Sequence, residues 1–476
     1  MSEEKNWGIR DFMAGMIDSD AIDDNLIPEN AARSCQNFIA RTMGKMKKRP
    51  GQARLNAADL GGFIQGLHAY YYGATPTRRL VAAYNGKAAY WNPGTTLFVE
   101  IRTGMNTSAP VLFEDCVNYL VACNGIDVPW KWDGTAVSAL LNAPATAQFP
   151  TLHKEQLFVV PKSEPSTLYW SDFFQPEVWP STNYQQIKEG DGDTIKALVK
   201  YLGELFIFKG RSIHSLRGTD VNDFRLDETD SKHGCVGPRA VVQSGIHLYY
   251  VSDDGIYLFN GMTSVNLTRQ YVPKLWAGVN KEHLHKAACG VWNGLIWFAL
   301  PEAASTVNNL LLIYRPPAGE TPGAFWPWRG INASCFLDYN DGQQVLFYAG
   351  DSGAGYVNRQ DVAGDDFTTT PITAYWEGKA YDMGMAEIEK KARKAFVQMS
   401  PDTAVAPTLA VSLNYGAFNV VSYVRVHSLV QQYRFVAQSR WRYLAPKFTH
   451  SAAGQCEIRG LLIPHKAKAR PKVRGA

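Results

Sequence analysis

Two histidines in the stretch EHLHK have a type and spacing that could do chemistry. His283 and His285 are separated by one residue. On a β-strand this spacing places both imidazoles on one face, where they could act as a pair of metal ligands. A zinc site needs a third or fourth ligand, and the sequence has no C-x-x-C pair to supply it. We therefore interpret the pair as surface or core histidines and predict no metal site.

Carboxylates gather in the stretches EGDGD and RLDETD. The residues are Glu189, Asp191, Asp193, Asp227, Glu228 and Asp230. A glycoside hydrolase needs two carboxylates at a defined separation, and these runs could supply them. Both runs stand in predicted turns, where solvated loop charges are the simpler interpretation. The sequence also has no phosphate-binding glycine loop, no G-x-S-x-G and no H-E-x-x-H. We predict that the chain is not an enzyme and needs no cofactor.

Recurring hairpins are the elements that would position such residues. The stretch YYVSDDGIYLFNG places apolar residues around an Asp-Asp-Gly and an Asn-Gly, which are strong signals of tight turns. Similar units recur along the chain, and together they number seven. The predicted hairpins cover 80–92, 118–134, 155–172, 203–218, 249–261, 294–315 and 343–361.

The spacing of these hairpins indicates a β-propeller. The units recur about every 44 residues, which is typical of four-stranded propeller blades. Each hairpin is predicted to form the middle of a blade. We expect about seven blades, with six or eight as alternatives because one unit is long and the last is short. The predicted propeller covers residues 51–365.

The two ends of the chain fall outside this rhythm. Residues 1–50 combine an acidic stretch with a basic cluster and are expected to form an N-terminal arm. Longer alternating strands over 366–465 predict an appended β-sandwich. Residues 466–476 hold five cations and no acid, so a basic tail that becomes ordered on a partner is expected. The fold class is therefore all-β.

Composition and charge limit the classes of function. The 476-residue chain is 46% hydrophobic and 12% aromatic, as expected of a folded β-rich protein. Its net charge of +4 is too small to argue for nucleic-acid binding by charge alone. No apolar run is long enough to span a membrane, and the N-terminus lacks a signal-peptide pattern. We expect a soluble protein that is made in a cytoplasm and has no membrane partner.

A series of specific turns carries a resemblance to a known family. In order, the turns are QNFIARTMGKMKKRPG, LYWSDFFQPEVW, EGDGDTIKALVKYLGELFIFKGRSIHSLRG, HGCVGPRAVVQSGIHLYYVSDDGIYLFNG and YAGDSGAGYV. Together, over residues 37–356, they resemble the propeller-bearing hub, or nozzle, proteins of short-tailed bacteriophages. That family is also described as packaged-DNA stabilisation or head-completion proteins.

The resemblance implies a structural role in the tail of a virion. Such proteins form rings, typically homohexamers, below the head-tail adaptor, where they continue the DNA channel and help to close it after packaging. The implied partners are further copies of the chain, an adaptor or portal-proximal protein and a distal tail component such as a needle, spike or fibre. Packaged DNA would pass without sequence-specific binding, because strong phosphate contacts would hinder ejection. The alternatives are a glycan- or receptor-binding propeller and, less favoured, a glycan hydrolase.

The two charged ends are the candidate assembly contacts. Segments of opposite sign commonly become ordered against a charged partner surface. The candidates are Asp18, Asp20, Asp23 and Asp24 in the arm, and Lys466, Lys468, Arg470, Lys472 and Arg474 in the tail. The alternative interpretation is that both ends only aid solubility.

Overall fold

The computed structural model confirms the all-β fold class. It describes residues 4–19, 26–42, 44–73, 77–400, 403, 405–425, 430–435 and 440–467. Within these ranges, antiparallel strands form seven four-stranded sheets and two larger ones. The helical elements found there are the short α1 (Thr268–Tyr271), α2 (Pro273–Ala277) and the single 3₁₀ turn η1 (Leu284–Lys286). None of these described helices has the length and apolar character needed to cross a membrane.

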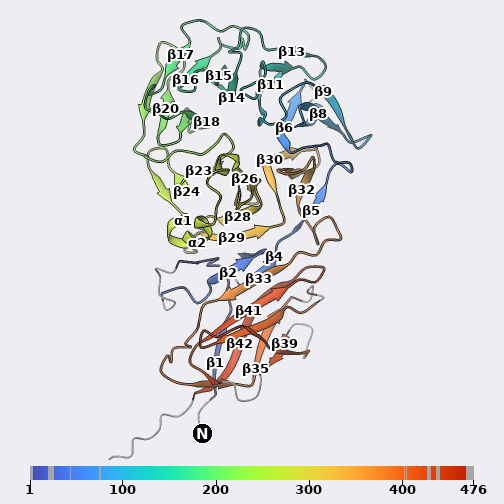
Figure 1. Ribbon diagram of the computed structural model, residues 1–476, viewed down its shortest axis with the longest axis vertical. Helices are drawn as coiled ribbons and strands as arrows, with labels where there is room; N and C mark the ends of the chain where they lie inside the picture. Colours follow the sequence, from blue (N-terminus) through green and yellow to red (C-terminus); the bar gives the residue numbers. More distant parts are fainter. Residues whose placement is uncertain are drawn as a thin grey trace, which may run out of the picture.

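The seven small sheets form a closed ring. The first strand of each sheet contacts the first strand of the next, in the order β6, β10, β14, β18, β22, β26 and β30, and β30 contacts β6 again. Figure 1 shows this ring face-on, in blue through yellow, at the upper end of the molecule. The arrangement is consistent with a β-propeller.

Six of the sheets consist of four strands that are consecutive in the chain. Their strands are β6 (Ile64–Tyr72), β7 (Thr77–Tyr84), β8 (Lys87–Asn92), β9 (Leu97–Arg102); β10 (Leu112–Cys116), β11 (Tyr119–Cys123), β12 (Trp130–Trp132), β13 (Val137–Ala139); β14 (Ala147–His153), β15 (Gln156–Pro161), β16 (Thr167–Trp170), β17 (Tyr184–Gln186); β18 (Ile195–Tyr201), β19 (Glu204–Lys209), β20 (Ile213–Arg217), β21 (Arg225–Glu228); β22 (Val241–Ser244), β23 (His247–Val251), β24 (Ile256–Phe259), β25 (Ser264–Asn266); and β26 (Ala288–Trp292), β27 (Leu295–Leu300), β28 (Leu310–Arg315), β29 (Ala324–Arg329).

The predicted hairpins are the middle strands of these sheets. The stretch at 80–92 forms β7 and β8, and the stretch at 249–261 forms β23 and β24. Asn85 and Gly86 join β7 to β8 with φ of 43° and 73°. Positive φ at both central residues is what a two-residue type I′ turn requires, which explains why Asn-Gly marks this hairpin.

The seventh sheet closes the ring with a strand from the beginning of the chain. β30 (Ala333–Asn340), β31 (Val345–Asp351) and β32 (Val357–Val362) are consecutive, but the fourth strand is β5 (Gly51–Arg54), which pairs antiparallel with β32. The first and last segments of the ring are therefore hydrogen-bonded in one sheet. Opening the ring requires breaking that pairing.

The two larger sheets form a second unit, which we call the distal body. One has nine strands: β1 (Glu4–Ile9), β3 (Phe38–Thr42), β4 (Lys45–Lys48), β34 (Lys390–Ala392), β35 (Lys394–Met399), β38 (Ser422–Arg425), β39 (Val430–Arg434), β40 (Arg440–Trp441) and β42 (Glu457–Ala467). The other has five: β2 (Ala32–Gln36), β33 (Ala374–Gly378), β36 (Thr408–Leu413), β37 (Asn419–Val420) and β41 (Leu444–His450). In Figure 1 the blue N-terminal strands lie among the orange and red C-terminal ones.

The expectation of an N-terminal arm outside any sheet is wrong for the described part of residues 1–50. β1 pairs with β42, from Glu4 opposite Lys466 to Ile9 opposite Leu461, and β4 pairs with both β3 and β42. β2 pairs with β33. The alternation of buried and exposed residues in β4 (KMKK) is typical of a strand, although its three lysines suggested an exposed basic cluster. The N-terminal segment is thus part of the distal body.

Candidate functional site

The junction between the ring and the distal body is held by an ion pair with two hydrogen bonds. Arg49 follows β4, and its guanidinium donates to Asp366 Oδ1 at 2.9 Å and to Oδ2 at 2.6 Å. Both side chains are buried. The same guanidinium also donates to the carbonyl of Arg329 in β29 and to the side-chain oxygen of Asn37. One arginine therefore ties together the ring, the segment after the ring and the N-terminal segment.

A second buried pair lies beside the first. Lys48 Nζ is 3.4 Å from Asp365 Oδ1 and donates to the carbonyl of Ala452 at 3.1 Å. Asp365 also accepts the N–H of Gly454 at 2.7 Å. Burial acts to raise the pKa of Asp365, but the Gly454 hydrogen bond and the charge of Lys48 outweigh it and hold this pKa below its usual value. The junction thus favours the ionised carboxylate.

Aromatic packing continues through the junction. Phe12 is fully buried and packs edge-on against Trp376 of β33, with ring centroids 5.2 Å apart. Trp328 of β29 donates its indole N–H to the carbonyl of Phe38 at 3.1 Å. The largest hydrophobic cluster includes side chains of the ring and of the distal body, so the two share one continuous core.

Asp18, a predicted assembly contact, is buried at this junction. Its two carboxylate oxygens accept the backbone N–H groups of Lys274 at 3.1 Å and Leu275 at 2.9 Å, at the beginning of α2. Burial raises the pKa of Asp18, although these two hydrogen bonds act to lower it. The side chain therefore connects the N-terminal segment to the ring. Asp20, Asp23 and Asp24 lie outside the described residues.

Lys466, expected at the start of a basic tail, lies in strand β42. It stands opposite Glu4 of β1 on one side and Lys391 of β34 on the other. The ordered sheet therefore extends to Ala467, two residues beyond the predicted end of the sandwich. Lys468, Arg470, Lys472 and Arg474 lie outside the described residues.

His283 and His285 do not lie on a strand. They flank and occupy η1, and their ring centroids are 6.2 Å apart. His285 Nδ1 is 3.1 Å from the carbonyl oxygen of Glu282, and burial lowers the pKa of His285. Because η1 is a helical turn, the i, i+2 spacing does not give the shared face that a strand would.

Two carboxylates of the first acidic run, EGDGD, stabilise the fourth sheet, which consists of β18 to β21. Both oxygens of Asp191 accept from Lys209 Nζ, at 2.7 and 2.6 Å, and the Lys209 side chain is fully buried. Asp193 accepts the backbone N–H groups of Gly210 and Arg211. In the second run, Glu228 pairs with Lys188 and lies 3.5 Å from Lys232. Asp191 and Asp193 are thus structural groups rather than free loop charges.

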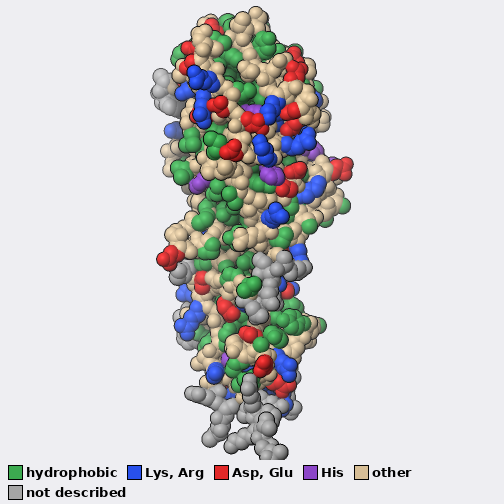
Figure 2. Space-filling model, turned by 90° about the vertical axis from the view of Figure 1, so that its left-hand side faces the viewer, with side chains coloured by type: hydrophobic (Ala, Val, Ile, Leu, Met, Phe, Trp, Pro, Cys, Tyr) green, Lys and Arg blue, Asp and Glu red, His purple; other side chains and the backbone are tan. Residues whose placement is uncertain are grey.

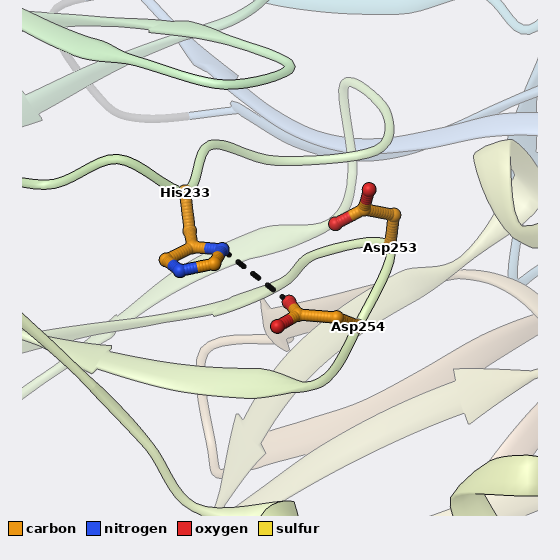
Figure 3. Close-up of side chains that lie close together, drawn as sticks. All are labelled: His233, Asp253 and Asp254. Atoms are coloured by element: carbon orange, nitrogen blue, oxygen red, sulfur yellow. Dashed lines mark ion pairs between the residues drawn. The ribbon is translucent and has the colours of Figure 1, made fainter.

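One cluster of candidate metal ligands was not predicted from the sequence. His233, Asp253 and Asp254 offer ligand atoms that all lie within 4.8 Å of one another, and His233 Nδ1 is 3.5 Å from Asp254 Oδ1 (Figure 3). A nitrogen and two carboxylates could hold a divalent cation, with water as the remaining ligand. However, the hydroxyl of Tyr257 already donates to Asp254 at 2.8 Å. The Asp-Asp-Gly pattern indicated only a turn, and no spacing signal links it to a histidine twenty residues earlier.

Comparisons with known proteins add little to this geometry. No protein-family model matches the chain, and no curated protein matches it significantly. Among solved structures, it is similar to the computationally designed Ika8 protein, at 11% identity and a TM-score of 0.40, over 66% of this chain and 100% of that one. It is also similar to BBS1N in complex with ARL6DN, at 12% identity and a TM-score of 0.43, over 66% of this chain and 97% of that one. Function is therefore inferred from the chain itself.

Proposed function

We propose that the chain is a structural protein of a bacteriophage tail. In this proposal it forms a ring of copies, a homohexamer, below the head-tail adaptor. This ring of copies continues the DNA channel, closes it after packaging and permits ejection of the DNA. We further infer that the seven sheets are the blades of a seven-bladed propeller and that the distal body is a β-sandwich-like domain. The turn motifs that resemble hub, or nozzle, proteins are the origin of this proposal.

The observation that carries the proposal is the rigid junction. A channel wall must keep its shape under load, and a protomer with a hinge between two units would not. Here β5 closes the ring of seven sheets within one chain, and β1 to β4 belong to the sheets of the distal body. Arg49 lies between β4 and β5. Because buried charge pairs are costly to break, the ring and the distal body are expected to move as one.

The surface charge is compatible with a wall that DNA passes. On the face drawn in Figure 2, Lys and Arg side chains are interspersed with Asp and Glu, without a broad area of one sign. A concentrated basic surface would add a salt-dependent attraction for each phosphate and hold the DNA back. The proposal therefore includes packaged DNA as a passing partner, with no sequence-specific binding.

The proposed partners are other copies of the chain, an adaptor or portal-proximal protein and a distal needle, spike or fibre. The proposed location is the virion tail, after synthesis in a host bacterial cytoplasm. We propose no catalysis and no cofactor. A glycan- or receptor-binding propeller is the alternative. A glycan hydrolase is less favoured, because Asp191 and Asp193 are engaged in holding the fourth sheet together.

Electron microscopy tests the proposal directly. The purified chain would be imaged alone and after mixing with a phage head-tail adaptor, and we expect closed rings, in the mixture at least. The junction variant Asp366→Asn should impair the assembly of copies into closed rings. Glu100→Gln, which removes an exposed ion pair with Lys87, should not impair it. Single protomers that ignore the adaptor but bind glycans on an array would contradict the proposal and favour the alternative.

A further inference from the structure

A pocket lies at the centre of the ring, on one of its faces. Its volume is about 400 Å³, which is within the range of about 300–1,000 Å³ typical of small-molecule sites. Most of its lining residues precede or begin the innermost strands of five sheets, among them Phe63 before β6, Pro110 before β10, Pro238 before β22 and Ala287 before β26. We call it the axial pocket. Every one of these strands contacts its neighbour around the ring, so the walls are rigid.

Arg239 lines the axial pocket and reaches across the ring. Its guanidinium donates to the backbone carbonyls of Gln65, of Val111 at 3.0 Å and of Ser334 at 3.3 Å. These carbonyls belong to or precede the innermost strands of three other sheets. Because all three acceptors are neutral, they satisfy hydrogen bonds without cancelling the charge.

The positive charge of Arg239 has no partner of opposite sign among the described residues. No carboxylate in the described part of the chain lies within ion-pair distance of this guanidinium. Burial lowers the pKa of Arg239, which reflects the cost of holding a cation away from water. A guanidinium has five N–H donors, and the three hydrogen bonds above leave two for another partner.

The surroundings of Arg239 suit an anion that has an apolar part. Phe63, Pro110 and Val307 supply apolar wall, while Lys286 and His285 are exposed residues that also line the pocket. Lys286 Nζ donates to the carbonyl of Thr306, which again leaves its charge unpaired by a carboxylate among the described residues. Charges near a low-dielectric wall attract an opposite charge more strongly than they would in open water.

We propose that the axial pocket binds a small organic anion, namely a carboxylate attached to an apolar group. The carboxylate would accept from one of the two remaining N–H donors of Arg239, Nε–H or the second N–H of Nη1, and the apolar part would contact Phe63 and Pro110. A single carboxylate fits because Arg239 is the partly buried cation of the pocket, whereas Lys286 is exposed to water. This ligand site is additional to the proposed tail function and does not depend on it.

Titration calorimetry and ligand-detected NMR on the full chain test the site with benzoate as the probe. Benzyl alcohol, which has the same ring and no charge, is the matched control. We expect benzoate to bind at least 10-fold more tightly than benzyl alcohol and to lose affinity as salt is raised. Equal affinity for the two compounds, or no binding of either, would overturn the proposal.

Two variants locate the binding. Lys286→Glu changes an exposed residue of the pocket, so the fold should be retained while the affinity for benzoate falls at least 10-fold. Arg239→Gln should abolish the preference for benzoate over benzyl alcohol, and circular dichroism would report whether the variant folds. Lys200→Ala is the control, because Lys200 is an exposed lysine that does not line the pocket. If Lys286→Glu binds benzoate as well as the parent does, the anion does not bind in the axial pocket.

Discussion

Arg49 and Asp366 are 317 residues apart in the chain, yet their side chains form two hydrogen bonds in the buried junction between the ring and the distal body. Arg49 precedes the strand that closes the ring, and Asp366 follows the last strand of the ring. The pair therefore fixes the entry of the chain into the ring beside its exit. It also stands next to the Lys48–Asp365 pair, so two positive and two negative groups share the junction.

Asp366→Asn should strongly destabilise the protein. The substitution removes the negative charge and leaves the guanidinium of Arg49 buried without its partner. Breaking a buried pair on one side typically costs about 3–5 kcal/mol in the free energy of unfolding. The measurement is urea denaturation followed by tryptophan fluorescence, since Trp328 and Trp376 lie at the junction.

Two controls accompany that measurement. Glu100→Gln removes an exposed ion pair and should change stability by no more than about 1 kcal/mol. Arg49→Met combined with Asp366→Leu removes both charges and should be less harmful than Asp366→Asn alone. If Asp366→Asn and Glu100→Gln prove equally mild, the junction pair does not hold the two units together.

The acidic run at 189–193 should divide into two structural carboxylates, Asp191 and Asp193, and the exposed Glu189. Asp191→Asn removes the charge partner of the fully buried Lys209 ammonium and leaves it with charge-neutral acceptors, among them the carbonyls of Ile187 and Lys188. We expect a loss of about 2 kcal/mol in the free energy of unfolding, because Asp191 is itself partly exposed. Glu189→Gln is the matched control at an exposed position and should stay within about 0.5 kcal/mol of the parent. Equal effects of the two changes would contradict the structural role of Asp191.

Acid should destabilise the third sheet through His153. Burial, with help from the charges of Lys154 and Lys200, lowers the pKa of His153 to about 4 from its ordinary 6.5. The unfolded chain therefore takes up this proton at a higher pH than the folded chain does. The contribution of neutral His153 to the free energy of unfolding is fully present above about pH 6.5. It falls as the pH drops toward 4, by at most about 1.4 kcal/mol per pH unit for this one proton.

His153→Leu should reduce that slope when unfolding is measured at a series of pH values from 7 to 4. A residual slope is expected, because burial also lowers the pKa values of His214, His450 and His465. A slope unchanged by His153→Leu would mean that His153 is protonated equally in the folded and unfolded chain.

The ring could be predicted from the sequence because its signals are local. Each hairpin combines apolar alternation with a turn residue inside about twenty positions, and Asn85–Gly86 adopts the conformation that this pair favours. The fourth strand of the last sheet could not be found in this way. β5 lies about 300 residues before its partner β32. A strand of four residues is too short for its hydrophobic pattern to predict a partner at that distance.

The sites were harder to predict than the fold. The lysines of β4 suggested a solvent-exposed segment, because a lysine is seldom buried without a charge partner. Lys48 is buried with Asp365 as its partner, and Asp365 is remote in sequence. The same holds for Arg239, whose three acceptors are backbone carbonyls that leave no mark in a sequence. His283 and His285 were noticed for a spacing that matters only on a strand, and they fall in a helical turn instead.

Removing residues 468–476 should leave the fold intact and weaken docking. The sequence analysis ended the sandwich at residue 465, but β42 continues to Ala467, and Lys466 and Ala467 pair with β34. A cut after Ala467 keeps every one of these pairings, whereas a cut after Pro464 removes the pairs of β1 and β34 with residues 465–467. We therefore expect the shorter protein to lose stability and the longer one to keep it, as measured by thermal unfolding.

The docking part of this prediction uses only the cut after Ala467. That variant lacks Lys468, Arg470, Lys472 and Arg474, so its addition to DNA-filled heads should be weaker than that of the full chain at low salt. The difference should shrink as salt is raised, because exposed charges more than about 10 Å apart are largely screened near 0.1 M. Head completion is measured by counting stabilised particles at both salt concentrations. If the truncated and full chains complete heads equally well at low salt, the cations of the tail have no docking role, and assembly depends on surfaces within residues 4–467.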